Sequence, residues 1–303
     1  MNPDRPGYAF GRAGADRCDG LRSDPDAIRA LWPDGRVILI DPHGAAVAQG
    51  PESSLDLYLP RGRELPDLLA EASLLGRDAD GAAWFALPSE RVGHLPEGRI
   101  DLRGAASGLP SLQAGLLAYG RALLHWQRHN RHCGRCGAPL SLLRAGHQAT
   151  CPACRSDFYP RTDPAVIVLV SDGERILLGR QASWPPRRYS VLAGFVEPGE
   201  QLEETVEREV MEEAGLRVLH SHYVASQPWP FPSALMIGFT ALAEPAEPTC
   251  GDELEDARWF DVETLMAEIA RGDLLLSPRI SIARYLIDDW LRQRGALASN
   301  PNV

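Results

Sequence analysis

Four cysteines constrain this chain more tightly than any other feature of its sequence. Cys133 and Cys136 form one C-x2-C pair, and Cys151 and Cys154 form a second pair after fourteen intervening residues. Two such turns can present four thiolates to one tetrahedral Zn²⁺, and a shell of four thiolates leaves no position for a catalytic water. The spacing therefore predicts a zinc ribbon over residues 129–158 that holds one structural Zn²⁺ per chain.

The surroundings of these pairs favour metal over disulfides. The other two cysteines, Cys18 and Cys250, stand far from the pairs and from each other. The first ten residues have Pro and Gly where a signal peptide would have its apolar stretch, and no apolar run approaches the roughly 20 residues that cross a bilayer. We therefore expect a cytoplasmic chain with no membrane partner, in which paired cysteines bind metal.

Two roles are open for the ribbon. The formal net charge of −10 makes the whole chain a poor non-specific binder of nucleic acid, because clustered cations hold a phosphate backbone. The ribbon nevertheless carries arginines that can contact phosphate. We favour a stabilising clip between two domains, because the motif alone has no base-reading code. The arginines are Arg131, Arg135, Arg144 and Arg155, and the nearby His125, His129 and His132 are expected to be surface residues rather than ligands.

At 303 residues the chain is long enough for two or three units. Short apolar runs at 37–40, 55–59 and 82–87 predict strands, and apolar residues at steps of four and three over 109–129 predict an amphipathic helix that leads into the ribbon. The predicted division is a poorly ordered tail at 1–25, an N-terminal α/β domain with its linking helix at 26–128, the ribbon at 129–158, a catalytic domain at 159–295 and a tail at 296–303.

The catalytic domain is predicted to be mixed α/β. Its strands are expected at 165–170, 175–178, 189–193, 216–223 and 234–242, with a charged helix at 202–214 that Gly215 ends and a last helix at 279–292 behind Ser277 and Pro278.

The charged helix carries three glutamates on one side. Glu209, Glu212 and Glu213 stand at i, i+3 and i+4, so their carboxylates crowd together and repel one another. A divalent cation would relieve that repulsion, and hard oxygen ligands suit Mg²⁺ or Mn²⁺. A solvated acidic face would be the plainer interpretation of an arbitrary Glu-rich helix.

The segment from Gly194 to Leu216 resembles the Nudix box at every defined position: Gly194, Glu200, Arg208, Glu209, Val210, Glu212, Glu213, Gly215 and Leu216. The resemblance implies a Nudix α/β/α sandwich with a mixed sheet, and attack of water on a diphosphate with the help of bound metal. It implies catalytic roles for Glu213, Glu209, Glu212, Arg208 and Glu200, and Mg²⁺ or Mn²⁺ ligands at Ala193, Glu209, Glu212, Glu213 and Glu253. Glu213 is our first choice for the base. Arg208 can pair with Glu204 or Glu212, and in the family with the residue matching Glu200.

Beyond the box, residues 226–233 read Ser-Gln-Pro-Trp-Pro-Phe-Pro-Ser and resemble the SQPWPFPxS signature of NADH pyrophosphatases. Three prolines stiffen this loop, so its aromatic residues can be offered to a nucleotide base. A Pro-rich turn with two buried aromatics is the alternative. The implied substrate-binding residues are Tyr159, Phe195, Gln227, Pro228, Trp229, Pro230, Phe231, Pro232, Ser233 and Ala283.

The resemblance implies hydrolysis of NADH or NAD⁺ to NMN(H) and AMP, with removal of NAD caps from RNA 5′ ends as a second activity on the same bond. It also implies a homodimer. One alternative is a Nudix diphosphatase for ADP-ribose or another nucleoside diphosphate derivative, against which the Pro-aromatic signature argues. The other is a non-catalytic nucleotide sensor, against which the intact glutamates argue.

Overall fold

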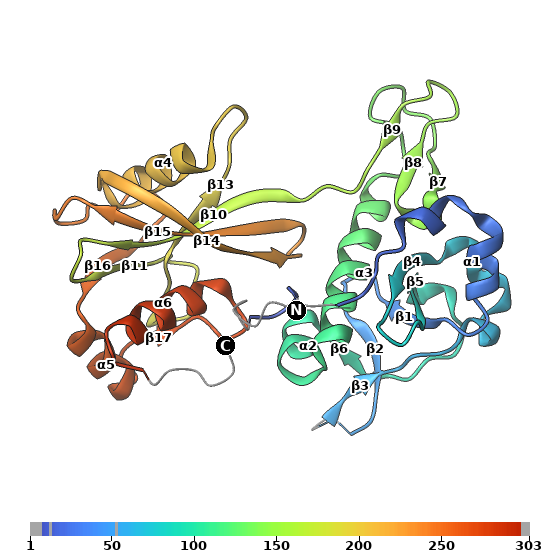
Figure 1. Ribbon diagram of the computed structural model, residues 1–303, viewed down its shortest axis with the longest axis horizontal. Helices are drawn as coiled ribbons and strands as arrows, with labels where there is room; N and C mark the ends of the chain where they lie inside the picture. Colours follow the sequence, from blue (N-terminus) through green and yellow to red (C-terminus); the bar gives the residue numbers. More distant parts are fainter. Residues whose placement is uncertain (1–7, 12–13, 52–53, 298–303) are drawn as a thin grey trace. The chain divides into compact units, whose positions relative to one another are not determined.

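The computed structural model describes residues 8–11, 14–51 and 54–297. Their contacts divide the chain into two compact units (Figure 1). The N-terminal unit contains residues 9–162 together with 229–233, and the C-terminal unit contains 163–228, the residues from 234 onward and Tyr8. The zinc ribbon thus packs as part of the N-terminal unit. No helix among the described residues is long and apolar enough to cross a membrane.

The N-terminal unit is built on a six-stranded sheet with the order β3-β2-β1-β5-β4 and β6 beside β2. The central strands β1 and β5 are parallel, and the other pairs are antiparallel. The three predicted strands of this region are confirmed as β1, β3 and β5. The bounds are β1 Arg36–Ile40, β2 Ala46–Gln49, β3 Asp56–Leu57, β4 Ser73–Arg77, β5 Ala83–Pro88 and β6 Arg99–Ile100.

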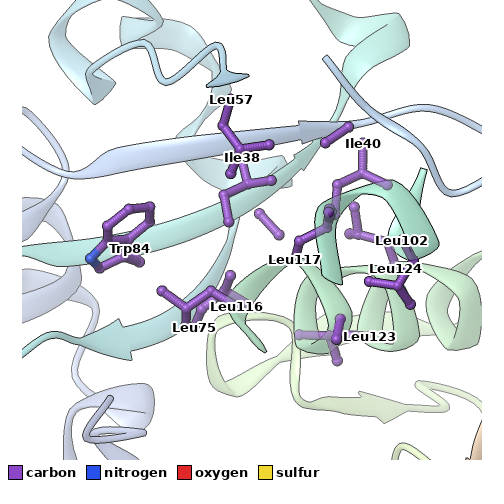
Figure 2. Packing of buried hydrophobic residues seen from close by; sticks show 14 of the residues in the cluster. Ile38, Ile40, Leu57, Leu75, Trp84, Leu102, Leu116, Leu117, Leu123 and Leu124 are labelled. Carbon is purple, nitrogen blue, oxygen red and sulfur yellow. The ribbon is translucent and has the colours of Figure 1, made fainter. Parts of the chain in front are cut away.

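The predicted linking helix is confirmed as α3, Ser111–His129, behind the short α2, Leu102–Gly108. Its apolar face packs on one side of the sheet, where Leu116 and Leu117 approach Ile38 and Leu75 (Figure 2). Burial of these aliphatic side chains supplies the main stabilising term for the unit. The opposite side of the sheet is covered by the short α1, Pro25–Leu31, and by 3-10 turns at Asp19–Ser23 and Pro66–Glu71.

The expectation of a poorly ordered tail at 1–25 does not hold for the described part of that segment. Phe10 and Cys18 are 7% and 8% exposed, and Asp16 forms an antiparallel bridge with Arg77 on β4. The Tyr8 hydroxyl donates to the carbonyl oxygen of Ser226 within the C-terminal unit, at 2.7 Å. Burial of these apolar side chains outweighs the local Pro and Gly content. Residues 1–7, 12–13 and most of the expected 296–303 tail lie outside the described residues.

The C-terminal unit is a mixed six-stranded sheet with the order β14-β15-β10-β11-β16 and β13 beside β10. Within it the β10–β15 pair is parallel, and the β10–β11, β10–β13 and β11–β16 pairs are antiparallel. Figure 1 shows α4 on one face and α5 with α6 on the other, and a separate apolar cluster fills each interface. This arrangement confirms the predicted α/β/α sandwich. The bounds are β10 Asp163–Ser171, β11 Ile176–Arg180, β13 Leu192–Phe195, α4 Leu202–Ala214, β14 Val218–Trp229, β15 Ala234–Ala243, β16 Asp256–Phe260, α5 Val262–Arg271 and α6 Ile282–Gln293, with a short parallel pair of β12 Arg188–Tyr189 and β17 Leu275–Leu276.

The last helix begins three residues later than predicted. The Ser281 N–H donates to the carbonyl of Pro278, which closes a turn before the helix. The Ser281 hydroxyl then accepts from the backbone N–H of Arg284 at 3.3 Å and caps α6. The expected Ser277-Pro278 start is therefore wrong, because a nearer serine supplies the cap.

Candidate active site

Helix α4 has the bounds predicted for the glutamate helix, and its two faces differ. Val206, Val210 and Ala214 have no exposed surface and pack on the sheet. Gly215 ends the helix at φ 66°, a left-handed conformation that glycine adopts without strain, and its N–H bonds to the carbonyl of Met211. The helix is thereby fixed in rotation, and the glutamates are fixed with it.

Two of the three glutamates are removed from solvent. Glu209 is 8% exposed and Glu213 is 3% exposed, whereas Glu212 is exposed. Burial, reinforced by the charges of Glu209 and Glu253, raises the pKa of Glu213 to about 8. Burial also raises the pKa of Glu209. The Oε2 atom of Glu213 has no hydrogen-bond partner among the described residues.

Arg208 holds the rest of the acidic group together. Its guanidinium donates to Glu200 at 2.6 Å, to Glu209 at 2.8 Å and to Glu212 at 2.9 Å. The bond from Arg208 is the main cause that lowers the pKa of Glu200 to about 2. The pairings expected with Glu200 and Glu212 are thus present. Glu204 instead accepts the backbone N–H of Gln201 and caps the helix start.

The first glycine of the box faces these carboxylates from β13. Gly194 pairs with Val166 on β10, and a Cβ atom built on Gly194 would lie 1.8 Å from Cδ of Glu209. The neighbouring Ala193 donates its backbone N–H toward Glu213, which partly offsets the rise in the pKa of that carboxyl. Glycine is needed at 194 because its missing side chain leaves the volume that Glu209 fills.

Because Gly194 lies so close to Glu209, adding one methyl group at position 194 should have a large effect on activity. We expect Gly194→Ala to lower kcat/KM by roughly 10²-fold, because a displacement near 1 Å at a reacting centre has that effect. Gly93→Ala is the matched control, since a Cβ there meets nothing within 4 Å. Steady-state kinetics and thermal unfolding of both variants check this. Full activity of Gly194→Ala would show that the position of Glu209 does not matter.

A loop that sequence reasoning overlooked places the fourth carboxylate. The N–H groups of Thr249 and Gly251 donate to the last carbonyls of α4, on Ala214 and Glu213, at 2.8 and 3.1 Å. A Cβ on Gly251 would lie 2.1 Å from the carbonyl oxygen of Glu212. The charge of Glu253, two residues further on, contributes to the raised pKa values of Glu209 and Glu213, so Glu253 lies beside the cluster. The resemblance named Glu253 itself, whereas the loop that positions it gave no sequence signal beyond Gly251.

The carboxylates suit a hard divalent cation by their chemistry rather than by a closed ligand geometry, because among the described residues only the four cysteines form a group of possible ligands whose atoms all lie within 4.8 Å of one another. Carboxylate oxygens are the ligands that Mg²⁺ and Mn²⁺ prefer, and a buried carboxylate oxygen without a partner, as in Glu213, is unfavourable unless a cation or a proton meets it. Without metal, the pKa of about 8 means that Glu213 keeps its proton at neutral pH. A bound cation would replace that proton, so metal binding and deprotonation of the cluster are coupled.

The coupling predicts how stability without Mg²⁺ depends on pH. The folded-state pKa of Glu213, about 8, exceeds the ordinary value of 4.5, so the folded state holds the extra proton between these values and loses stability as pH rises. We expect the free energy of unfolding to fall by about 1–2 kcal/mol from pH 6.5 to 8. His147, whose pKa burial lowers to about 4 from 6.5, acts oppositely, and most of its effect lies below this window.

Urea unfolding of zinc-loaded, Mg²⁺-free protein at the two pH values measures the effect, with Glu213→Gln as the reference. The decrease should be absent in that variant, and Mg²⁺ should reverse the decrease in the parent protein. An equal pH dependence in both proteins would show that Glu213 is not the titrating group.

The predicted substrate residues of the C-terminal unit differ in accessibility. Phe195 is 61% exposed beside the box. Gln227 is fully buried, and its side-chain amide bonds to the backbone at the start of α6. The amide donates to the carbonyl of Ile280 and accepts from the N–H of Ile282, both at 2.8 Å. Ala283 is 4% exposed and packs in the core. Substrate contact by Phe195 stays a prediction. The burial of Gln227 and Ala283 indicates that these two side chains stabilise the fold.

The aromatic residues of the signature loop belong to the N-terminal unit. Trp229 and Phe231 stand 4.9 Å apart between ring centres and pack against its core cluster, next to Phe10. Arg103 and Arg121 lie over the Phe231 ring at 4.5 and 4.9 Å. Arg121 also donates to the carbonyl of Pro230. These contacts match the alternative of partly buried aromatics rather than rings offered to a base. Pro228 and Pro232 are exposed and Ser233 is half-buried.

The four ribbon cysteines meet at one point, as predicted. Their sulfur atoms all lie within 4.8 Å of one another, on loops that flank the strands β7 Ser141–Leu143, β8 Gln148–Thr150 and β9 Asp157–Phe158. Gly137 and Arg155, each directly after the second cysteine of a pair, have positive φ values of 77° and 58°. This geometry fits a tetrahedral Zn²⁺. Tyr159, just beyond β9, is 58% exposed in the N-terminal unit.

Two family models match the chain, and their boundaries agree with these sites. The NADH pyrophosphatase zinc ribbon domain matches residues 128–159, and the NUDIX domain matches residues 161–279. The first model covers the sulfur cluster, and the second covers the carboxylate cluster with Glu253.

Curated relatives extend the similarity to nearly the whole chain. A Mycobacterium bovis protein named NAD-capped RNA hydrolase NudC is 39% identical over 294 residues, covering 92% of this chain and 93% of the relative. A mouse protein named mitochondrial NAD(P)H pyrophosphatase NUDT13 is 35% identical, covering 90% of this chain and 89% of the relative. A Stutzerimonas stutzeri protein, also named NAD-capped RNA hydrolase NudC, is 46% identical over 59% of this chain and 62% of its own length. With the box, the sulfur cluster and the sandwich in place, the chain belongs to the zinc-ribbon NADH pyrophosphatase family of Nudix hydrolases.

Proposed function

We propose that this protein hydrolyses the diphosphate bond of NADH and NAD⁺, giving NMN(H) and AMP, and removes NAD caps from RNA 5′ ends by cutting the same bond. The observation that carries the proposal is the carboxylate cluster, in which Glu209 and Glu213 are buried and the Oε2 atom of Glu213 has no hydrogen-bond partner among the described residues. The names of full-length relatives, NAD-capped RNA hydrolase and NAD(P)H pyrophosphatase, support the substrate.

In the proposed reaction a water oxygen forms a bond to one phosphorus as the bridging P–O bond breaks. The water proton passes to a carboxylate of the cluster, for which Glu213 is the first choice because burial raises its pKa and so makes its deprotonated form a stronger base. Arg208 holds Glu209 and Glu212 in place through its own hydrogen bonds. The chain's contribution is therefore a fixed set of acceptors, which requires no covalent enzyme intermediate.

The proposed cations are Mg²⁺ or Mn²⁺, held by Glu209, Glu212, Glu213 and Glu253 with the backbone of Ala193. Such an ion lowers the pKa of water and offsets negative charge on phosphate oxygens. Four acidic side chains without it would repel a dinucleotide diphosphate. Glu200 has a different part in the proposal, because it anchors the Arg208 side chain that orders the others.

For the ends of the dinucleotide we propose contacts with Phe195 and Tyr159, whose rings are 61% and 58% exposed. Exposed aromatic rings suit stacking on a base or nicotinamide. Because the Trp229 and Phe231 rings pack on protein, we propose that this loop supports the fold of the N-terminal unit. We further propose a cytoplasmic homodimer, which light scattering after size exclusion tests as twice the 33.1 kDa chain mass.

The substrate assignment is tested by comparing kcat/KM for NADH, an NAD-capped RNA and ADP-ribose with Mg²⁺ and with Mn²⁺. All three contain a diphosphate, so the comparison isolates recognition of the nicotinamide end. We expect NADH or the capped RNA to exceed ADP-ribose. Preference for ADP-ribose would replace the proposed substrate while leaving the diphosphatase chemistry intact.

A further inference from the structure

Charge is distributed very unevenly along this chain. Residues 102–162, which include α2, α3 and the ribbon, contain eight arginines and a single acidic residue, Asp157. Their formal charge is +7, whereas the remaining residues sum to −17. The overall charge of −10 therefore hides a strongly basic segment. A local basic surface, rather than net charge, determines whether a polyanion can bind.

Most arginines of this segment already have partners. Arg128 bonds to Glu90 and to the carbonyl of Asp41, and Arg144 bonds to Asp19 and Ser23. Arg103 and Arg121 lie over Phe231 in the signature loop. These side chains stabilise the N-terminal unit. They are excluded from a binding surface, including Arg144, which the sequence alone had suggested.

Three other arginines of this segment, close in sequence to the cysteines of the ribbon, lack such partners among the described residues. Arg131, Arg135 and Arg155 are exposed, and their guanidinium groups make no ion pair or hydrogen bond within the described part of the chain. Arg135 lies between the first two cysteines and Arg155 directly follows the last, so both flank the same sulfur cluster. The one acidic side chain of the segment, Asp157, accepts from Thr150 at 2.6 Å. We call Arg131, Arg135 and Arg155 the ribbon arginines.

A plainer role for the ribbon arginines is to offset the −2 charge of Zn²⁺ with four thiolates. The hydrogen bonds do not favour it, because the donors to sulfur in these turns are backbone N–H groups, from Arg135 to Cys133 at 3.4 Å and from Cys154 to Cys151 at 3.5 Å. No guanidinium group of the ribbon arginines donates to these sulfur atoms within the described part of the chain. The guanidinium groups are available to phosphate oxygens, which Arg binds in bidentate geometry.

We propose that the ribbon arginines bind the phosphate backbone of single-stranded RNA behind the 5′ cap. This inference rests on the proposed removal of NAD caps, and it assigns to the ribbon a role beyond holding zinc. The ribbon is joined to the catalytic sheet by the four residues after Phe158, since β10 begins at Asp163. A capped RNA differs from the free dinucleotide by the ribonucleotide chain that follows the cap, and the phosphates of that chain are its charged groups. The ribbon arginines therefore distinguish the two substrates by phosphate contact.

The test is a triple variant, Arg131→Gln, Arg135→Gln and Arg155→Gln, in the full-length zinc-loaded protein. Its control is Arg29→Gln, Arg63→Gln and Arg271→Gln, which removes the same charge from exposed arginines elsewhere. Binding of a fluorescent NAD-capped 12-mer is followed by anisotropy without Mg²⁺ over a range of salt. kcat/KM is measured in parallel for NADH and for the capped RNA.

We expect the ribbon variant to keep its zinc and its NADH hydrolysis, to bind the capped RNA about tenfold less tightly at low salt, and to lose about two from the slope of log K against log salt. The control should match the parent protein. Loss of zinc from the ribbon variant, or an equal decrease of kcat/KM for NADH, would show that these arginines have a structural role. An equal effect of the control variant would show that RNA binding depends on the total charge of the protein. Either result overturns the inference. Parent protein that cleaves NADH but neither binds nor cleaves the capped RNA, or that binds acidic vesicles instead, also overturns it. If the parent protein also fails to hydrolyse NADH, the result would count against the proposed function itself.

Discussion

Glu213→Gln should lower kcat for NADH by roughly 10²–10⁴-fold, the range for loss of a general acid or base, and abolish it if the same carboxylate also binds the metal. Glutamine has the same shape and no charge, so the buried site keeps its packing at Val210 and Ala214. The variant should fold normally, because the parent carboxyl, with a pKa of about 8, is itself uncharged at neutral pH without metal.

The matched control is Glu207→Gln on the same helix. Glu207 is exposed and stands at an undefined position of the box, so its replacement should leave kcat within about twofold, as expected of an exposed substitution that alters stability little. Mg²⁺ titration by calorimetry should show weaker binding and less proton release for Glu213→Gln than for Glu207→Gln. A fully active Glu213→Gln protein would remove Glu213 from the catalytic group.

Cys151→Ser should abolish zinc binding. Cys151 has no exposed surface and its sulfur lies 3.5 Å from that of Cys136, so a hydroxyl there cannot replace the thiolate. The ribbon packs on the core of the N-terminal unit through Leu140, Ala149 and Phe158, but the three residues of β7 are all exposed. Structural zinc contributes an apparent binding free energy of about 10–16 kcal/mol in small zinc modules, so its loss should unfold the ribbon.

Elemental analysis and limited proteolysis measure this result. We expect one zinc per chain in the parent and nearly none in Cys151→Ser, with new cleavage between Arg131 and Arg155. Cys250→Ser, which removes an exposed cysteine away from the cluster, should keep both zinc and protease resistance. A full complement of zinc in Cys151→Ser would contradict the four-thiolate site.

The catalytic helix was predictable because its signals are local. The spacing of Glu209, Glu212 and Glu213 fixes one face, and the apolar residues fix the other, so the predicted bounds 202–214 match α4. Gly215 ends the helix as its backbone freedom suggests. The two cysteine pairs were equally local. Helix α5, behind an Asp261 cap, was missed because its apolar pattern is short.

The remaining features depend on partners distant in sequence. Nothing around Trp229 indicates that it packs against Phe10, more than 200 residues earlier. Likewise, nothing near Gly251 in the sequence indicates that its backbone lies against the end of α4. The raised pKa of Glu213 arises from burial in the assembled sandwich and from the charge of Glu253, which the helix alone does not contain. Local patterns predicted the chemistry, whereas tertiary contacts set its geometry.

The most direct test is to incubate the purified zinc-loaded protein with NADH and Mg²⁺ or Mn²⁺ and to separate the products by chromatography. We expect equal amounts of reduced nicotinamide mononucleotide and AMP, with no reaction when the divalent cation is omitted. Intact NADH after prolonged incubation of a folded, zinc-loaded sample, or cleavage at the nicotinamide–ribose bond instead of the diphosphate, would contradict the proposed diphosphatase activity.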